Sequence, residues 1–159
     1  MMFVVKGIPK ALKRARVSSK GTFYDPSKKD KQDFLLQCKN HAPGAPLKGE
    51  VRIWITFYFK RPKSHYVSNN PKNKLKNTAP VAHTSKPDLD NLVKFVLDAL
   101  NGSFYIDDSQ IHKIEALKKY HSENNSTQIS IVNLWYYINI NYITLKILGL
   151  NDTEDTKSR

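Results

Sequence analysis

The stretch "SKPDLDNLVKFVLDALNGSFYIDDSQIHKI", residues 85–114, contains a helical pattern followed by acidic residues. Its apolar residues recur at the three- and four-residue spacing of a helix that buries one face. They are Leu89, Leu92, Val93, Val96, Leu97 and Leu100. Asp88 stands where an N-terminal cap is expected, and Gly102 stands where helices commonly end. The pattern predicts a helix over residues 88–101.

The flanking segments predict a second helix and four strands. Residues 2–6 and 51–59 read as strands, and the second alternates apolar with more polar side chains. Because the other face of strand 51–59 is also partly apolar, we expect it to be central. Residues 24–44 predict a helix with Asp25 as its N-cap and with Pro43 and Gly44 at its end. Residues 111–120 and 127–138 predict two more strands. This order predicts an α/β (α+β mixed) fold, a single small domain with two main helices packed on a mixed β-sheet.

We expect the chain to form one domain followed by two short C-terminal segments. We expect residues 1–131 to form the domain and residues 132–150 to be an apolar extension, a strand or hairpin packed on the domain or on a dimer partner. Residues 151–159 form a polar tail. Residues 7–21 and 60–86 contain no acidic residue and are predicted to be basic loops. A loop as long as the second is usually functional or mobile.

The charge of the chain indicates its partners. The 159 residues include 26 lysines and arginines against 14 acidic residues, a formal net charge of +12. Such an excess favours a polyanionic partner, with nucleic acid first and an anionic membrane second, although a solvated basic surface is also compatible with it. The single cysteine, Cys38, excludes an intramolecular disulfide and a cysteine-based zinc site, which fits a cytoplasmic location. No apolar run reaches about 18 residues, so we expect no membrane span.

Five aspartates gather in the opening stretch: Asp88, Asp90, Asp98, Asp107 and Asp108. Each has an ordinary interpretation as a helix cap, a helix-dipole partner, a solvated residue or a turn residue. The alternative is that the Asp107–Asp108 pair returns along the helix toward Asp88 and Asp90. Three or four carboxylates would then meet, and a hard divalent cation such as Mg²⁺ or Mn²⁺ would relieve their repulsion.

A metal ion held by aspartates suits phosphodiester cleavage. It can orient and deprotonate a water molecule and neutralise charge on the phosphate during attack. Lys94, four residues after Asp90, can contact the phosphate or simply form an ion pair with Asp90. Basic residues around the acids are needed to hold the DNA backbone. We expect this role for Lys10, Lys13, Arg14, Arg16, Lys72, Lys74, Lys76 and Lys86.

The motifs "KPDLDNLVKFVLDALNG" and "YIDDSQI" closely resemble the signature of the RusA family of Holliday-junction resolvases. Upstream, "GIPKALKRAR", "YDP", "RPKSHY" and "HTSKPD" are similar to the family's phage and prophage versions, so the likeness covers about residues 3–131. The resemblance implies a homodimer that nicks four-way DNA junctions with Mg²⁺, with no small-molecule cofactor. It also implies that Asp88, Asp90 and Asp108 are the essential metal-binding acids, that Lys94 is functional, and that Asp107 is a supporting or structural residue.

Symmetry favours the same assembly, because a resolvase must cut two strands at nearly symmetric points and two identical chains supply two identical sites. Two other functions stay open from the sequence. One is a non-catalytic DNA-binding protein whose aspartates only cap a helix and form turns. The other is a nuclease of the same chemistry that acts on other branched DNA.

Overall fold

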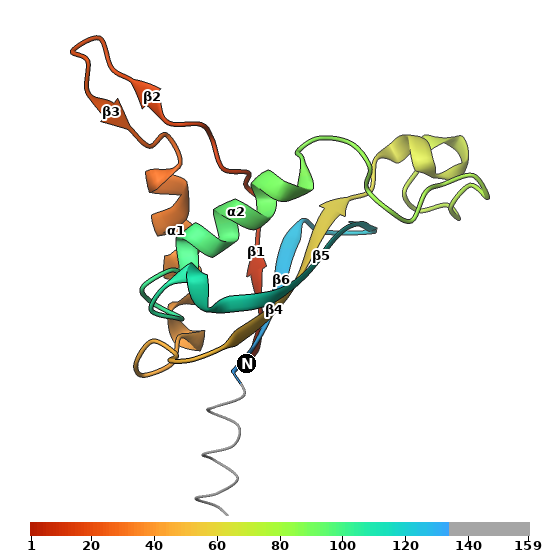
Figure 1. Cartoon of the computed structure of the whole chain (residues 1–159). Helices are drawn as coiled ribbons and strands as arrows, with labels where there is room; N and C mark the ends of the chain where they lie inside the picture. Colours follow the sequence, from red (N-terminus) through yellow and green to blue (C-terminus); the bar gives the residue numbers. More distant parts are fainter. Residues whose placement is uncertain (134–159) are drawn as a thin grey trace, which may run out of the picture.

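A computed structural model describes residues 1–133 (Figure 1). The predicted strand beyond Asn133, most of the apolar extension 132–150 and the tail 151–159 lie outside the described residues. The described chain runs through strand β1 (Met2–Lys6), the short strands β2 (Arg16–Val17) and β3 (Phe23–Tyr24), and helix α1 (Lys28–Cys38). It continues through β4 (Val51–Lys60), helix α2 (Leu89–Leu100), β5 (Ile111–His121) and β6 (Ser126–Asn133).

The main sheet has four strands in the order β1-β6-β4-β5. Strand β4 pairs in parallel with β5 and antiparallel with β6, so the sheet is mixed and β4 is internal, as the sequence predicts. Alternate residues of β4 are buried in the core: Val51, Ile53, Ile55, Phe57 and Phe59. The predicted fold class, a small mixed α+β domain, is confirmed.

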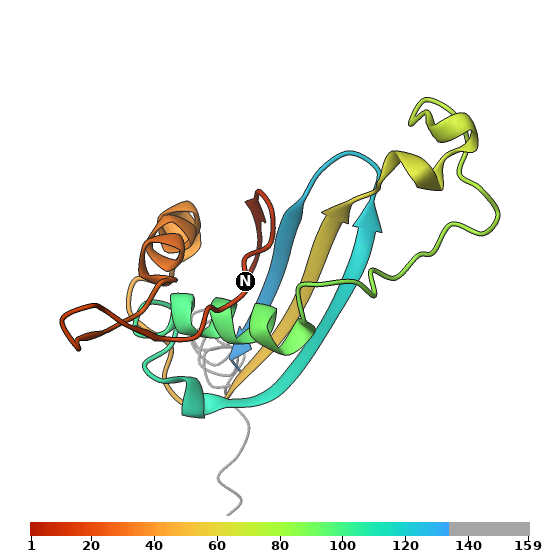
Figure 2. The ribbon, with the colours of Figure 1, turned by 90° about the horizontal axis from the view of Figure 1, so that it is seen from above.

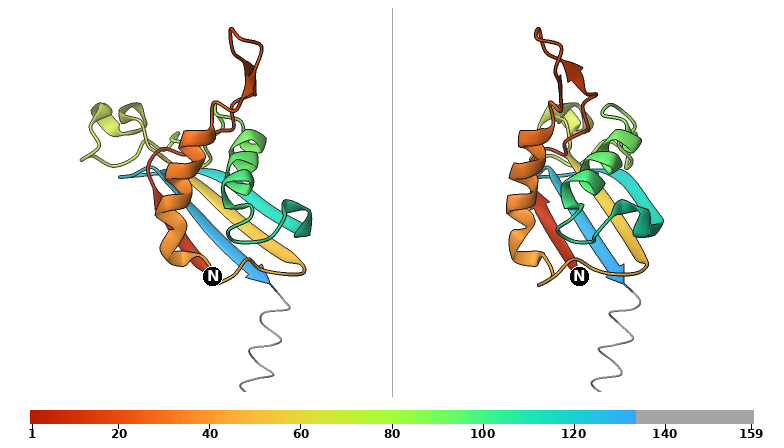
Figure 3. Two further views of the ribbon diagram at one scale, coloured as in Figure 1. Left: turned by 90° about the vertical axis from the view of Figure 1, so that its left-hand side faces the viewer. Right: turned by 60° about the vertical axis from the view of Figure 1, so that its left-hand side comes forward.

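Both helices pack on one face of the sheet (Figures 2 and 3). Helix α2 buries Leu92, Phe95, Val96, Ala99 and Leu100, which is the apolar face that the spacing predicts. Gly102 follows the helix with a φ of 73°, a conformation that glycine adopts without strain. Lys31 of α1 reaches Asp98 of α2 at 3.3 Å, so Asp98 links the two helices by an ion pair.

The start of α1 differs from the prediction. The N-cap position is occupied by Ser27, and Asp25 lies two residues earlier. The Asp25 carboxylate instead accepts a hydrogen bond from the Ser27 backbone N–H at 2.7 Å and pairs with Lys31 at 2.7 Å. Asp25 therefore stabilises the turn that leads into the helix, a turn that keeps Pro26 outside it.

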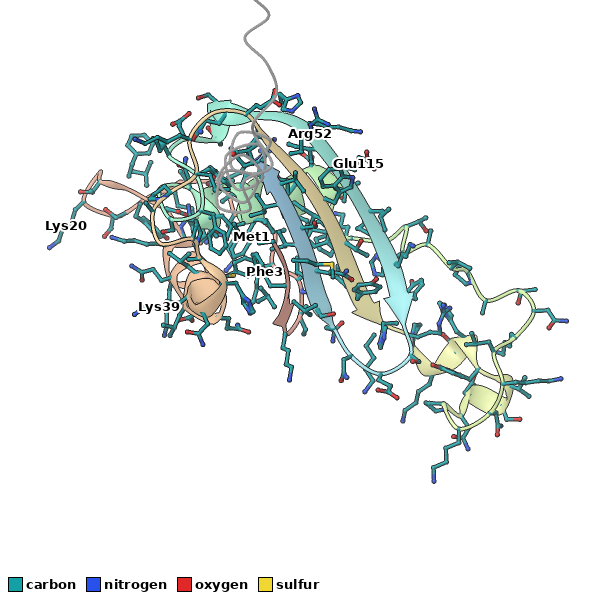
Figure 4. The ribbon with its side chains drawn as sticks, turned by 90° about the horizontal axis from the view of Figure 1, so that it is seen from below. Met1, Phe3, Lys20, Lys39, Arg52 and Glu115 are labelled. Atoms are coloured by element: carbon teal, nitrogen blue, oxygen red, sulfur yellow. The ribbon has the colours of Figure 1, made fainter. Side chains whose placement is uncertain are left out.

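The predicted basic loop at residues 7–21 is in part a hairpin. Strands β2 and β3 pair antiparallel, Arg16 with Tyr24 and Val17 with Phe23, and form an arm that projects from the domain (Figure 3). Ser18 closes the tip, because its backbone N–H donates to the Thr22 carbonyl and its hydroxyl accepts from the Thr22 and Lys20 N–H groups. Figure 4 shows Lys20 at the end of this arm, well away from the sheet.

Residues 61–80 form a second projection, here called the lobe (Figure 1). It contains two short 3-10 turns, Lys63–His65 and Val67–Asn69, and otherwise irregular backbone, in agreement with the predicted loop. Arg61 fastens its base by donating to the Pro80 carbonyl at 2.7 Å. Within residues 1–133, no helix is long and apolar enough to cross a membrane.

Candidate functional site

Asp88 and Asp90 stand at the entrance of helix α2. Asp88 occupies the N-cap position with an extended backbone (φ −70°, ψ 142°), but its side chain makes no capping hydrogen bond. The prediction that Asp88 occupies the N-cap position is therefore confirmed, whereas the side-chain capping hydrogen bond is absent. Within the described part of the chain the Asp88 carboxylate has no hydrogen-bond or ion-pair partner, so it is available to a ligand.

Asp90 faces Lys94 one helical turn further on. The Lys94 Nζ atom lies 3.5 Å from Asp90 Oδ2, and the two side chains are 60% and 63% exposed. An exposed pair of this kind stabilises a protein by only about 0.3–0.5 kcal/mol. The interaction is thus weak enough for a bound phosphate or cation to replace it.

Asp107 and Asp108 are neighbours with different surroundings. The Asp107 carboxylate accepts the Ser109 backbone N–H at 2.9 Å, and the Asp107 N–H donates to the Gln110 side chain at 2.9 Å. Hydrogen bonds from the Ser109 side chain and backbone hold the pKa of Asp107 below its usual value. Asp107 therefore shapes the turn, whereas the exposed Asp108 carboxylate has no such contact with any described residue.

Gln110 fastens this turn to the body of the domain. Its side-chain amide donates to the Leu47 carbonyl at 3.1 Å and to the Gly49 carbonyl at 2.8 Å. The acidic turn is consequently held in one place by three hydrogen bonds of the Gln110 side chain, and Asp108 is exposed to solvent on this turn.

The carboxylates do not meet within one chain. The Asp107–Asp108 turn follows the C-terminal end of α2, while Asp88 and Asp90 stand at its start, and a 12-residue helix spans about 18 Å. Among residues 1–133, no three His, Cys, Asp or Glu side chains form a group that could hold a metal ion. The expectation that the acidic pair returns along the helix is wrong, because the segment that returns is the far end of β5.

That returning end of β5 brings Lys118 to the helix entrance. The Lys118 Nζ atom donates to the Ser85 carbonyl at 2.6 Å and to the Pro87 carbonyl at 2.7 Å. Lys118 was not among the site residues predicted from the sequence. Its place two residues from Ala116 and from Tyr120, on the partly buried face of β5, could have indicated that Lys118 points inward.

The predicted DNA-contacting residues fall into two groups. Three are engaged within the protein: Lys10 and Lys13 lie 3.4 and 3.0 Å from Asp30, and Lys76 donates to the Ser64 carbonyl at 2.7 Å. The hydrogen bond from Lys13 is the main cause that keeps the pKa of Asp30 low. Within the described region, no side-chain partner is found for Arg14, Arg16, Lys72, Lys74 and Lys86.

The free cations lie on the two projections and beside the helix entrance. Arg14 and Arg16 belong to the arm, Lys72 and Lys74 to the lobe, and Lys86 precedes Asp88 by two residues. The arm also carries Phe23, whose side chain is 76% exposed. Phe23 was not predicted as a site residue, because a two-residue strand has no period that would distinguish an exposed aromatic from a buried one.

The described residues thus place exposed carboxylates at the helix entrance and, on the two projections and beside that entrance, cations without side-chain partners. Comparison with known proteins identifies the class: residues 6–132 match the family of the endodeoxyribonuclease RusA. The chain belongs to the RusA endodeoxyribonuclease family, whose members are Holliday-junction resolvases. It is also similar to the uncharacterized protein YqaN of Bacillus subtilis (strain 168), 38% identical over 135 residues that cover 81% of this chain and 93% of that protein.

Proposed function

We propose that this protein is a Mg²⁺-dependent, structure-selective endodeoxyribonuclease that resolves four-way DNA junctions by paired symmetric nicks during recombination and repair. The observation that carries the proposal is the family match over residues 6–132, combined with exposed carboxylates at the positions that the resemblance to the family motif marks as essential. Cleavage of DNA places this activity in the cytoplasm of a bacterial or phage-infected cell.

The donor set fits a hard divalent cation. Asp88 and Asp108 offer exposed carboxylate oxygens without partners among the described residues, and Asp90 offers one that is paired only with the exposed Lys94. Mg²⁺, or Mn²⁺ in its place, prefers such oxygen ligands. The bound cation would supply an activated water and offset the negative charge of the phosphate. Lys94, which is held only weakly by Asp90, can turn to a non-bridging phosphate oxygen.

We propose that two chains complete each metal site. Asp88 and Asp90 stand at one end of α2 and Asp108 follows the other end, so one chain offers an incomplete set of ligands at either end. In a two-fold dimer, residue i of one chain meets residue j of the other, and the reverse contact also forms. Pairing the helix entrance of one chain with the acidic turn of its partner would therefore create two identical sites. Two such sites suit paired nicks on a junction with two-fold symmetry.

The arm and the lobe supply the surface for branched DNA. They project from opposite sides of the domain with α2 between them (Figures 1 and 2). Their free cations can contact separate stretches of phosphate backbone, which gives affinity without reading sequence. Phe23 adds an aromatic face on which an unpaired base at the branch point can stack.

Cleavage of a labelled four-way junction tests the proposal. We expect paired nicks with Mg²⁺ and none with EDTA. Asp90→Asn should reduce cutting at least 100-fold while junction binding is retained or tightened, because the substitution removes a charge that repels DNA. If Asp90→Asn cuts as fast as the wild type, the assignment of Asp90 fails.

The same experiment separates the two alternative functions. A non-catalytic DNA-binding protein would bind the junction with a steep salt dependence and cut nothing at any metal concentration. A nuclease for other branched DNA would cut flaps or three-way forks faster than four-way junctions. A panel of these substrates therefore decides between the proposal and its alternatives.

A further inference from the structure

The segment before helix α2 forms backbone hydrogen bonds with the end of strand β5. Ala82 forms an antiparallel bridge with Lys119, the His83 N–H donates to the Lys118 carbonyl at 3.1 Å, and the Tyr120 N–H donates to the Val81 carbonyl at 3.1 Å. Beyond His83 the backbone leaves the strand and turns toward the helix (Figure 2). Over residues 85–87 the contact with β5 passes to a side chain, that of Lys118.

The Lys118 side chain binds the backbone immediately before Asp88. Its ammonium donates to the Ser85 carbonyl at 2.6 Å and to the Pro87 carbonyl at 2.7 Å, two short charge-assisted hydrogen bonds. The Pro87 carbonyl belongs to the peptide group whose nitrogen is that of Asp88. Because a peptide group is planar, fixing this carbonyl also fixes the direction in which the backbone enters Asp88.

Asp88 needs such support more than an ordinary helix cap does. An N-cap side chain is normally oriented by its own hydrogen bond to the helix, and Asp88 makes none. The orientation of its carboxylate therefore depends on the backbone that carries it. The two hydrogen bonds that the Lys118 side chain donates to main-chain carbonyls restrain this backbone from the side of β5.

We propose that Lys118 is a positioning residue, which holds the Ser85–Pro87 backbone so that the Asp88 carboxylate is oriented for the divalent cation. This inference rests on the proposed function, because it assumes that Asp88 binds the cation. Lys118 touches neither the cation nor DNA in this role. It acts through the backbone, as outer partners of metal ligands commonly do.

The test compares Lys118→Met with Lys119→Met in the full chain. Both variants lose one positive charge from β5, but Lys119 points to the opposite face of the strand, opposite Tyr58, and its side chain has no hydrogen-bond or ion-pair partner among residues 1–133. Binding of Mn²⁺ alone is measured by titration calorimetry. We expect Lys118→Met to weaken Mn²⁺ binding about 10- to 100-fold, the usual effect of losing a residue that orients a metal ligand. Lys119→Met should bind Mn²⁺ as the wild type does.

Two further measurements distinguish positioning from loss of charge or of folding. Junction affinity in EDTA should be the same for both methionine variants, and Lys118→Arg, which keeps the charge and the N–H donors, should recover most of the Mn²⁺ affinity. Equal Mn²⁺ affinities for Lys118→Met and Lys119→Met would overturn the inference. If Lys118→Met does not fold, Lys118→Gln, which keeps one amide donor group, takes its place under the same criteria.

His83 reports on the lysine independently of any activity. Its ring stacks on Phe59 with 4.0 Å between the ring centroids, and its pKa is lowered first by burial and second by the charge of Lys118. The His83 pKa, measured by NMR, should rise in Lys118→Met and stay unchanged in Lys119→Met. An unchanged His83 pKa in Lys118→Met would contradict the position of Lys118 itself. A wild type that cuts no branched DNA would instead contradict the proposed function.

Discussion

At the scale of single residues, the structure separates aspartates that look equivalent in the sequence. Asp98 pairs with Lys31 and Asp107 shapes its own turn, so both have structural partners. Asp88 and Asp108 are exposed and have no side-chain partner among the described residues. Spacing alone could not choose between Asp107 and Asp108, since both follow the same strand-like residues. The family resemblance favours Asp108, and the hydrogen bonds of Asp107 provide a physical reason for that choice.

Asparagine substitutions of Asp107 and Asp108 should therefore differ strongly in their effect on DNA cleavage. Asp107→Asn keeps an oxygen that can accept the Ser109 N–H, so we expect cutting within a few-fold of the wild type. Asp108→Asn removes a charge that we assign to metal binding and should reduce cutting at least 100-fold with an unchanged melting temperature. Cleavage rates and thermal unfolding of both variants measure this. Strong loss of cutting in Asp107→Asn alone would reverse the assignment.

The lowered pKa of Asp107 also predicts a pH dependence. A carboxyl group whose pKa is lower in the folded state stabilises the fold above its unfolded pKa, and loses this effect as the pH falls through its folded value. Asp107→Ala should thus unfold at a lower temperature than the wild type at pH 7. The two melting temperatures should converge as the pH falls below 3.8, the ordinary value for this group. A constant difference across this range would contradict the role of Asp107.

At the scale of elements, helices and strands with a regular apolar spacing were predicted correctly from the sequence, whereas short irregular segments were not. The apolar spacing of α2 and the alternation of β4 are imposed by burial of one helix face and one strand face, and both elements were predicted nearly to their ends. The arm was missed because strands of two residues have no readable alternation. The N-cap of α1 was misplaced because Asp25 and Ser27 are both good capping residues, and only the backbone path shows which one occupies the position.

The arm gives a prediction about charge. Arg14→Ala with Arg16→Ala removes two cations without side-chain partners in the described region. We expect the negative slope of log K against log salt for junction binding to become shallower by about two. Lys10→Ala with Lys13→Ala makes the same change in charge, but these lysines are already paired with Asp30, so the slope should change less. Affinities measured between about 50 and 200 mM salt test this, and equal slopes for the two double variants would contradict it.

At the scale of the whole molecule, the sequence singled out candidate metal-binding acids but did not show how the fold distributes them. The helix period places Asp88 and Asp90 at the start of α2, yet it does not say at which end the next turn stands. Strand β5 pairs in parallel with β4 and begins beside the C-terminal end of α2, so Asp108 remains there. The apolar and polar pattern of one chain does not show how two copies of that chain associate. For this reason, completion of the site by a second chain became a proposal only once the structure had separated the acids.

Mixing two inactive variants tests the central claim, that each metal site takes Asp90 from one chain and Asp108 from its partner. Asp90→Asn and Asp108→Asn are each expected to be inactive. In a mixed dimer, one site would receive both substitutions and the other would keep Asp88, Asp90 and Asp108 intact. Co-refolded protein, with mixed dimers verified by native mass spectrometry, should therefore nick one strand of a four-way junction in Mg²⁺. Mixed dimers that cut no faster than either variant alone would contradict the account.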